Sequence, residues 1–226
     1  MANSASDAGG SEYEIRKKMI EDGIISQMVT LPSNMFSSVT LPATLWFFDK
    51  AKAETEKRDE ILFVDARNIF TQVDRAHRKF TDEQIKNLGI ITRLYEGDTE
   101  AFAALISEYK SEMESAPETA DDKDTKTKVY WGEQIEWLTS RFPEGVYRDV
   151  VGLCKVAKIE GEDGIKDQDY SLNPGRYVGV VIEDDGMTAD EFKAEMLSLN
   201  EELAKLNEEA HKLEDRITEN LKGLFT

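Results

Sequence analysis

The feature that most constrains the fold is a seven-residue apolar repeat near the C-terminal end of the sequence. Apolar residues follow one another there at alternating steps of four and three positions, the spacing of a coiled-coil seam. Glutamate and lysine fill half of the intervening positions, and neither proline nor glycine interrupts the stretch before Gly223. We therefore expect one helix of roughly thirty residues with a single apolar ridge. The ridge consists of Phe192, Met196, Leu199, Leu203, Leu206, Ala210, Leu213 and Ile217.

This ridge predicts a partner helix. Removing each large apolar side chain from water is worth about 1.5–3 kcal/mol before the entropy cost is subtracted. One partner is another segment of the same chain, in an antiparallel pairing. The sequence holds no second uninterrupted heptad stripe of similar length, and this favours a helix supplied by another chain.

Three short apolar runs in the first 65 residues predict strands. Uniformly apolar strands are usually covered on both faces, which is typical of an α/β sheet with helices packed on it. A helix precedes the first run, since Ser11 and Glu14 have the spacing of a capping box and Gly23 is placed to end the helix. The three runs are residues 24–31, 43–48 and 60–64.

From Thr81 the apolar period becomes helical. Thr81 and Gln84 form a second capping box, and further helices are expected from Thr99 and around Trp131. Residues 115–128, with a proline and a run of Asp, Lys and Thr, are typical of a linker. We divide the chain into an α/β part at residues 1–80, a helical and irregular region at 81–182 and a C-terminal assembly helix at 183–226.

The net charge of −18 argues against a chain that binds DNA unaided, because an acidic surface repels phosphate. Any contact with DNA must come from a local basic patch or from a partner. The densest basic cluster is Arg75, His77, Arg78 and Lys79; Arg75, Arg78 and Lys79 are the candidate phosphate contacts, and an ordinary solvated face is the alternative interpretation.

Other chemistry is not supported by the sequence. His77 and His211 are far apart, so a metal or catalytic pair is not expected. Residues 173–176 (Asn-Pro-Gly-Arg) resemble a base-gripping tetrapeptide but lack its second proline and its aromatic residue, and they predict a type II turn instead. One cysteine, no apolar run long enough to span a bilayer and no signal peptide predict a cytoplasmic chain without a membrane role.

Several ordered blocks resemble the modification (methylation) subunits of type I restriction-modification systems. Residues 14–21, 31–36, 41–48 and 61–67 are similar to the end of the methylase domain of that family. Residues 81–85, 152–155, 170–179 and 219–224 are similar to its tail, and the block Tyr170–Gly179 is the most specific of these.

This resemblance implies the C-terminal part of a Rossmann-like methyltransferase sheet, followed by a helical region and a long coiled-coil-type helix. It implies an adenine-N6 DNA methyltransferase that uses S-adenosylmethionine in the complete subunit. The implied partners are a specificity subunit, a restriction subunit, and DNA through the complex. Phe36 would contact the target base, and the ridge would pack on helices of the specificity subunit.

The cofactor loop and the Asn-Pro-Pro-Phe motif of such enzymes are not in this sequence. We therefore expect no catalytic, cofactor-binding or metal-binding residues in this chain, and no methyl transfer by the chain alone. The alternative hypothesis is a non-enzymatic coiled-coil adaptor derived from a methylase, which would dimerise through the ridge.

Overall fold

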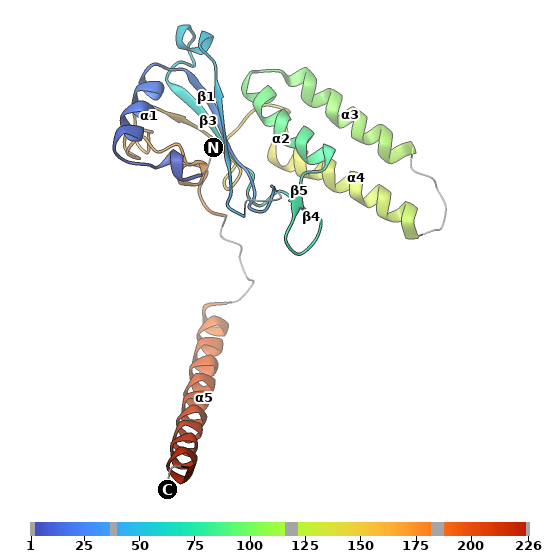
Figure 1. Ribbon diagram of the computed structural model, residues 1–226. Coiled ribbons are helices and arrows are strands. Elements are labelled where there is room, and N and C mark those ends of the chain that lie inside the picture. Colours follow the sequence, from blue (N-terminus) through green and yellow to red (C-terminus); the bar gives the residue numbers. More distant parts are fainter. Residues whose placement is uncertain (1–2, 37–39, 116–121, 182–187, 225–226) are drawn as a thin grey trace. The chain divides into compact units, whose positions relative to one another are not determined.

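The computed structural model describes residues 3–36, 40–115, 122–181 and 188–224. The chain divides into two compact units, Met1–Val181 and Ile182–Thr226. The first unit holds a mixed sheet with helices on both faces, as Figure 1 shows. The second unit contains a single described element, the helix α5 (Ala189–Leu224).

The three predicted strands are confirmed as β1 (Ile25–Thr30), β2 (Thr44–Phe48) and β3 (Glu60–Asp65). A fourth strand, β6 (Cys154–Lys158), completes a sheet with the order β2-β1-β3-β6. The β1 and β3 strands are parallel, whereas β2 and β6 are antiparallel to their neighbours. A separate two-stranded hairpin joins β4 (Thr71–Gln72) to β5 (Arg78–Lys79).

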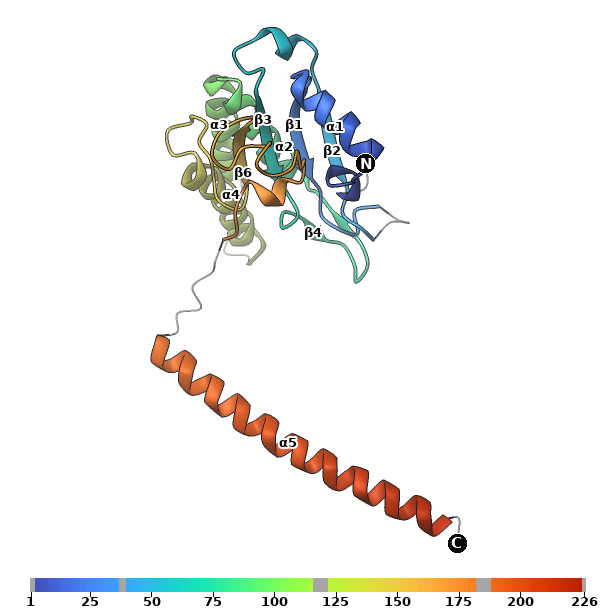
Figure 2. The same cartoon turned by 90° about the vertical axis from the view of Figure 1, so that its left-hand side faces the viewer.

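Each face of the sheet carries its own hydrophobic core. On one face, Val29, Leu62 and Val64 pack beneath the helices α2 (Asp82–Tyr95), α3 (Thr99–Ser115) and α4 (Asp122–Arg141). On the other face, Met28 and Phe63 pack beneath α1 (Ser11–Glu21) and the segment that follows β6. Figure 2 shows the sheet between these two layers. The covering of both faces explains why nearly every residue of β1 and β3 is buried, whereas the edge strand β2 keeps Leu45, Phe47 and Phe48 exposed. Three short 3-10 turns complete the description: η1 (Asn3–Ser6), η2 (Ala51–Glu54) and η3 (Pro174–Arg176).

The helix ends agree in part with the sequence signals. The capping box of Thr81 and Gln84 is confirmed, and Gly23 has the left-handed φ of 70° expected at the end of a helix. The capping box predicted for Ser11 is wrong, because Gly10 occupies the cap position and makes no side-chain cap. Ser11 is already the first helical residue, one position past the cap. Its hydroxyl is therefore not placed to accept hydrogen bonds from the backbone N–H groups of the first turn.

Two predictions for the middle of the chain need correction. The predicted linker at residues 115–128 is wrong from Asp122, where α4 begins; residues 116–121 lie outside the described part. Packing of α4 against α3 outweighs the polar composition of its first turns. The strand β6 was not predicted, and it joins residues 154–158 to the sheet begun in residues 1–80. The predicted division of the chain at residues 80 and 182 stays a prediction. The pairing of β3 with β6 means that the sheet extends across the boundary at residue 80.

The C-terminal repeat forms one continuous helix of 36 residues, as its spacing predicted. A capping box at Thr188 starts it: the Thr188 backbone N–H donates to Glu191 Oε2, and the Glu191 N–H donates to Thr188 Oγ1. The large ridge residues stay between 51% and 58% exposed along the helix. These residues are Phe192, Met196, Leu199, Leu203, Leu206, Leu213 and Ile217.

Buried phenols and one buried thiol should make the first unit less stable as the pH rises into the alkaline range. Burial raises the pKa of Tyr95, Tyr109, Tyr147 and Tyr177, and it raises the pKa of Cys154 to about 11. A pKa that is higher in the folded than in the unfolded state gives stability that is complete below the unfolded value and is lost as the pH rises toward the folded value. We expect the urea midpoint to be constant near pH 8 and to fall steadily from about pH 9, where unfolded thiols and phenols begin to ionise.

Tyr177→Phe is the matched control for this pH dependence. The variant loses the hydrogen bond from the Tyr177 hydroxyl to the Ser171 carbonyl, so its midpoint at pH 8 is lower. Its midpoint also falls less steeply above pH 9, because one titrating phenol has been removed. A wild-type midpoint that stays constant up to pH 11 would show that these groups do not govern stability.

Candidate functional site

The candidate site lies where the two parallel strands end. Thr30 and Asp65 are paired as the last residues of β1 and β3, so the loops that follow leave the sheet side by side. In open α/β sheets this edge is where ligands usually bind. Figure 2 shows the β4–β5 hairpin at the same end of the sheet as the loop after β1.

The loop after β1 carries the predicted base contact, Phe36. Leu31 and Pro32 are buried and anchor the start of the loop. Asn34 adopts a left-handed φ of 60°, a conformation that asparagine tolerates better than most residues and that turns the chain sharply. Phe36 follows with 49% of its surface exposed. A large aromatic ring held at the sheet edge and open to solvent is available for stacking, and residues 37–39 lie outside the described part.

The hairpin that bears the basic cluster is bonded to this loop. The backbone N–H of Arg78 donates to the carbonyl of Asn34 at 2.9 Å, and Arg78 Nη1 donates to Ser33 Oγ at 3.0 Å. The guanidinium also lies 3.9 Å from the ring centre of Phe70. The structure therefore brings together the two site features that the sequence predicted separately.

The three basic residues of the cluster differ in their surroundings. Arg75 and Lys79 are exposed, whereas Arg78 is half-buried and engaged with its neighbours. Asp74 lies beside them at the hairpin turn, where hydrogen bonds from the Ala76 backbone N–H and from His77 hold its pKa below the ordinary value. This fixed negative charge offsets part of the positive field of the hairpin.

A second polar group at this edge was missed by the sequence analysis. Arg67, two residues after β3, donates from Nε to both carboxylate oxygens of Asp65 at 2.9 and 3.0 Å. The hydrogen bond to Asp65 raises the pKa of Arg67. Arg67 Nη2 lies only 2.7 Å from where a Cβ on Gly175 would stand, so a side chain at position 175 would have to displace it. The sequence signal was an Asp and an Arg directly after a buried strand.

The block Tyr170–Gly179, the most specific part of the resemblance, mainly covers the sheet. The Tyr177 ring stacks on Phe63 with 3.9 Å between centroids, and the carbonyl of Tyr170 accepts from Arg16 Nε at 2.8 Å. The predicted type II turn at residues 173–176 is wrong: these residues form the 3-10 turn η3, capped by Asn173, whose Oδ1 accepts from the Gly175 N–H. Proline at its first position favours the negative φ angles of that turn.

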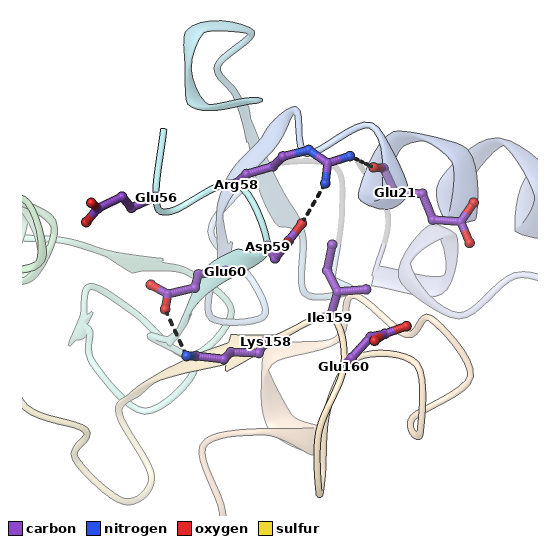
Figure 3. Close-up of a pocket in the computed structure, with 8 residues that line it drawn as sticks. All are labelled: Glu21, Glu56, Arg58, Asp59, Glu60, Lys158, Ile159 and Glu160. Atoms are coloured by element: carbon purple, nitrogen blue, oxygen red, sulfur yellow. Dashed lines mark hydrogen bonds and ion pairs between the residues drawn. The ribbon is translucent and has the colours of Figure 1, made fainter. Parts of the chain in front are cut away.

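A charged pocket of about 460 Å³ lies near the amino end of β3, opposite to the candidate site (Figure 3). Its cations are already paired: Lys158 lies 3.6 Å from Glu60, and Arg58 binds Asp59 at 3.2 Å and the Glu21 carbonyl at 2.9 Å. The surplus of carboxylates repels phosphate, so this pocket does not suit nucleic acid. Its other lining residues are Glu56, Ile159 and Glu160.

No group of three or more His, Cys, Asp or Glu side chains among the described residues is arranged to hold a metal ion. No described helix combines the length and the hydropathy needed to cross a membrane. The candidate site at the carboxyl ends of β1 and β3 consists of one exposed aromatic residue, exposed basic residues and the loops that hydrogen bonds hold together.

Comparison with known proteins agrees with this picture. The family described as N-6 DNA Methylase matches residues 1–113, which include β1 to β5 and the loop with Phe36, and the chain belongs to this family. The resemblance to type I methylase subunits is also confirmed. The chain is 33% identical over 99% of its length to the type I restriction enzyme MjaIX methylase subunit of Methanocaldococcus jannaschii. It is 31% identical over 98% of its length to the HindI methylase subunit of Haemophilus influenzae.

The chain spans about a third of these relatives, 31% of the MjaIX subunit and 38% of the HindI subunit. A crystal structure of a type I restriction-modification methyltransferase subunit from Streptococcus thermophilus overlaps 77% of this chain and 24% of its own, with 20% identity and a TM-score of 0.43.

The contacts of Arg78 predict that it holds the Phe36 loop in place, whereas Arg75 does not. Arg78→Ala removes the bonds to Ser33 and Gln72 and the contact with Phe70. We expect it to lower the free energy of unfolding by about 1–2 kcal/mol and to speed amide exchange at Asn34 and Phe36. Arg75→Ala, at an exposed turn, should change neither. Equal effects of the two substitutions in urea unfolding and hydrogen exchange would contradict this role.

Proposed function

We propose that this chain is part of the modification subunit of a type I restriction-modification system, which methylates adenine N6 in DNA. In this proposal its sheet is the C-terminal part of a Rossmann-like methyltransferase sheet. Membership of the N-6 DNA methylase family and similarity to two type I methylase subunits support it. The role of the chain within the subunit is assembly with the specificity subunit and shaping of the target-base pocket, in the cytoplasm.

The single observation that carries the assembly role is the exposed ridge of α5. Seven large apolar side chains lie along one face of a 36-residue helix and stay half exposed. Each would contribute about 1.5–3 kcal/mol when buried, so the ridge favours association with another helix. We propose that the partner is the specificity subunit, which would connect the chain to the restriction subunit.

The candidate site carries the second role. Phe36 contacts the extruded adenine, and the exposed Arg75 and Lys79 contact phosphate through the assembled complex. Arg78 is the third candidate for a phosphate contact. Because its side chain is bonded to Ser33 and Gln72, its main role in this proposal is to hold the loop with Phe36 in place. Base contacts of this kind need an unstacked base, which the complete enzyme must supply.

The runner-up is a coiled-coil adaptor without enzymatic function. The observation in its favour is the same ridge, because a heptad seam also suits a homodimer of two identical helices. The two functions differ in the partner: the adaptor pairs α5 with a second α5 and has no use for a specificity subunit.

Replacing two ridge leucines should abolish binding of the specificity subunit. Leu199→Asp together with Leu206→Asp places two charges in the seam, and a loss of about 3 kcal/mol would weaken binding by at least about 100-fold. Co-purification and titration calorimetry with a cognate specificity subunit measure this. The matched control is Ala194→Asp with Ala204→Asp, which adds the same two charges away from the ridge and should leave binding unchanged.

The same experiment separates the two functions. If the wild-type chain does not bind the specificity subunit but sediments as a dimer that the Leu199→Asp, Leu206→Asp variant disrupts, the adaptor function is correct and the proposal fails.

S-adenosylmethionine belongs to the complete subunit in this proposal, and the isolated chain transfers no methyl group. Incubation with duplex DNA and methyl-labelled S-adenosylmethionine should give incorporation equal to a protein-free blank, while a complete type I methylase assayed in parallel labels the same DNA. Incorporation above the blank that heating the chain abolishes would refute this prediction.

A further inference from the structure

The β4–β5 hairpin has two faces with different surroundings. Gln72 and Arg78 lie directly opposite each other in the two strands, so their side chains point to the same face. This inner face supports the loop with Phe36, because Arg78 Nη1 donates to Ser33 Oγ while Arg78 Nε donates to Gln72 Oε1 at 3.3 Å. The inner face is therefore occupied by the chain itself.

The outer face of the hairpin carries Val73, His77 and Lys79. Each of these residues is one position away from Gln72 or Arg78, and side chains alternate along a strand, so they point away from the inner face. All three are exposed, and Val73 is 56% exposed at the tip. Figures 1 and 2 show that the hairpin projects beyond the end of the sheet. The outer face thus presents one apolar side chain next to basic ones.

The turn that carries Val73 is fixed by its own hydrogen bonds. The Asp74 carboxylate accepts from the backbone N–H groups of Ala76 at 2.7 Å and His77 at 2.9 Å. The Val73 N–H donates to the His77 carbonyl at 3.0 Å, and Gln72 Nε2 donates to the same carbonyl at 3.2 Å. A tip that is already ordered loses little conformational entropy when it enters a complementary surface.

DNA from which one base has been extruded offers such a surface. Unstacking and unpairing a base costs free energy, and proteins that open base steps often insert an apolar side chain between them. A two-stranded ribbon fits into the major groove of B-DNA. The hairpin meets both needs, because its inner face holds the loop with Phe36 and its outer face carries Val73 beside Lys79.

We propose that the outer face of the hairpin enters the DNA duplex beside the extruded adenine, where Val73 contacts the bases that border the gap. This inference rests on the proposed function and adds a positioning residue to it. Val73 stabilises the opened duplex without touching the adenine, while the exposed Arg75 and Lys79 meet phosphates at the sides of the groove. Asp74 is the opposing charge, and its carboxylate is engaged by the N–H groups of the turn.

Methylation by the complete subunit, assembled with its specificity subunit, tests this role. Val73→Ala should lower kcat/KM for duplex DNA by at least about fivefold, because the opened duplex is stabilised less. Val73→Ile keeps a β-branched apolar side chain and should behave as the wild type. Val146→Ala is the matched control: Val146 is 53% exposed and lies outside the hairpin, so its replacement should change nothing.

DNA in which the target adenine lies opposite an abasic site separates this role from a purely structural one. Such an adenine has no pairing partner, so its extrusion costs less. The defect of Val73→Ala should shrink to less than about twofold on this DNA. On fully paired DNA, 2-aminopurine at the target position brightens when it leaves the stack, and the increase should be smaller with Val73→Ala than with the wild type.

Three outcomes would overturn the inference: Val73→Ala methylates paired DNA as well as the wild type, it is equally impaired on both DNAs, or it loses binding to the specificity subunit. The last outcome would make the outer face a protein contact. A wild-type complex that transfers no methyl group would instead refute the proposed function, and this inference with it.

Discussion

The parallel pairing of β1 and β3 is the constraint on which the rest of the first unit depends. Parallel neighbours need a long connection, and here that connection contains β2 and η2 before β3 begins. Because the two strands end together at Thr30 and Asp65, the loop with Phe36 and the turn with Arg67 leave from one edge. Both faces of these central strands must also be covered, which requires α1 on one side and α2 to α4 on the other. The positions of the candidate residues follow from this single register.

Local signals were sufficient for the elements that depend on local physics. The strands of residues 25–30 and 60–65 were predicted because their apolar-rich runs are short and, in the first case, contain several β-branched residues and stop at Pro32. The α2 cap was predicted because Thr81 and Gln84 have the spacing at which the two residues bond to each other. The strand β6 gave no such signal: two of the five residues of Cys154–Lys158 are lysines, and its strand conformation comes from pairing with β3, about ninety positions earlier.

The candidate site shows the same division between local and distant contacts. Phe36 and the basic cluster could each be selected from residue type and neighbours. Their association through Asn34 and Arg78 could not, because it joins loops 44 positions apart and depends on the fold. The proximity of Arg67 to Gly175 spans an even longer stretch of sequence. Composition suggests what a residue can contact, whereas the fold decides which residues meet.

The buried side chain of Arg16 has a consequence for the order in which the chain can fold. Its guanidinium donates to the carbonyls of Ala8 and Tyr170, which are 162 positions apart in the sequence. Because Tyr170 is synthesised 154 residues after Arg16, α1 cannot reach its final surroundings until almost the whole first unit has been made. During translation the apolar side of this helix stays uncovered until Tyr170 has left the ribosome, which gives chaperones a long interval in which to bind it.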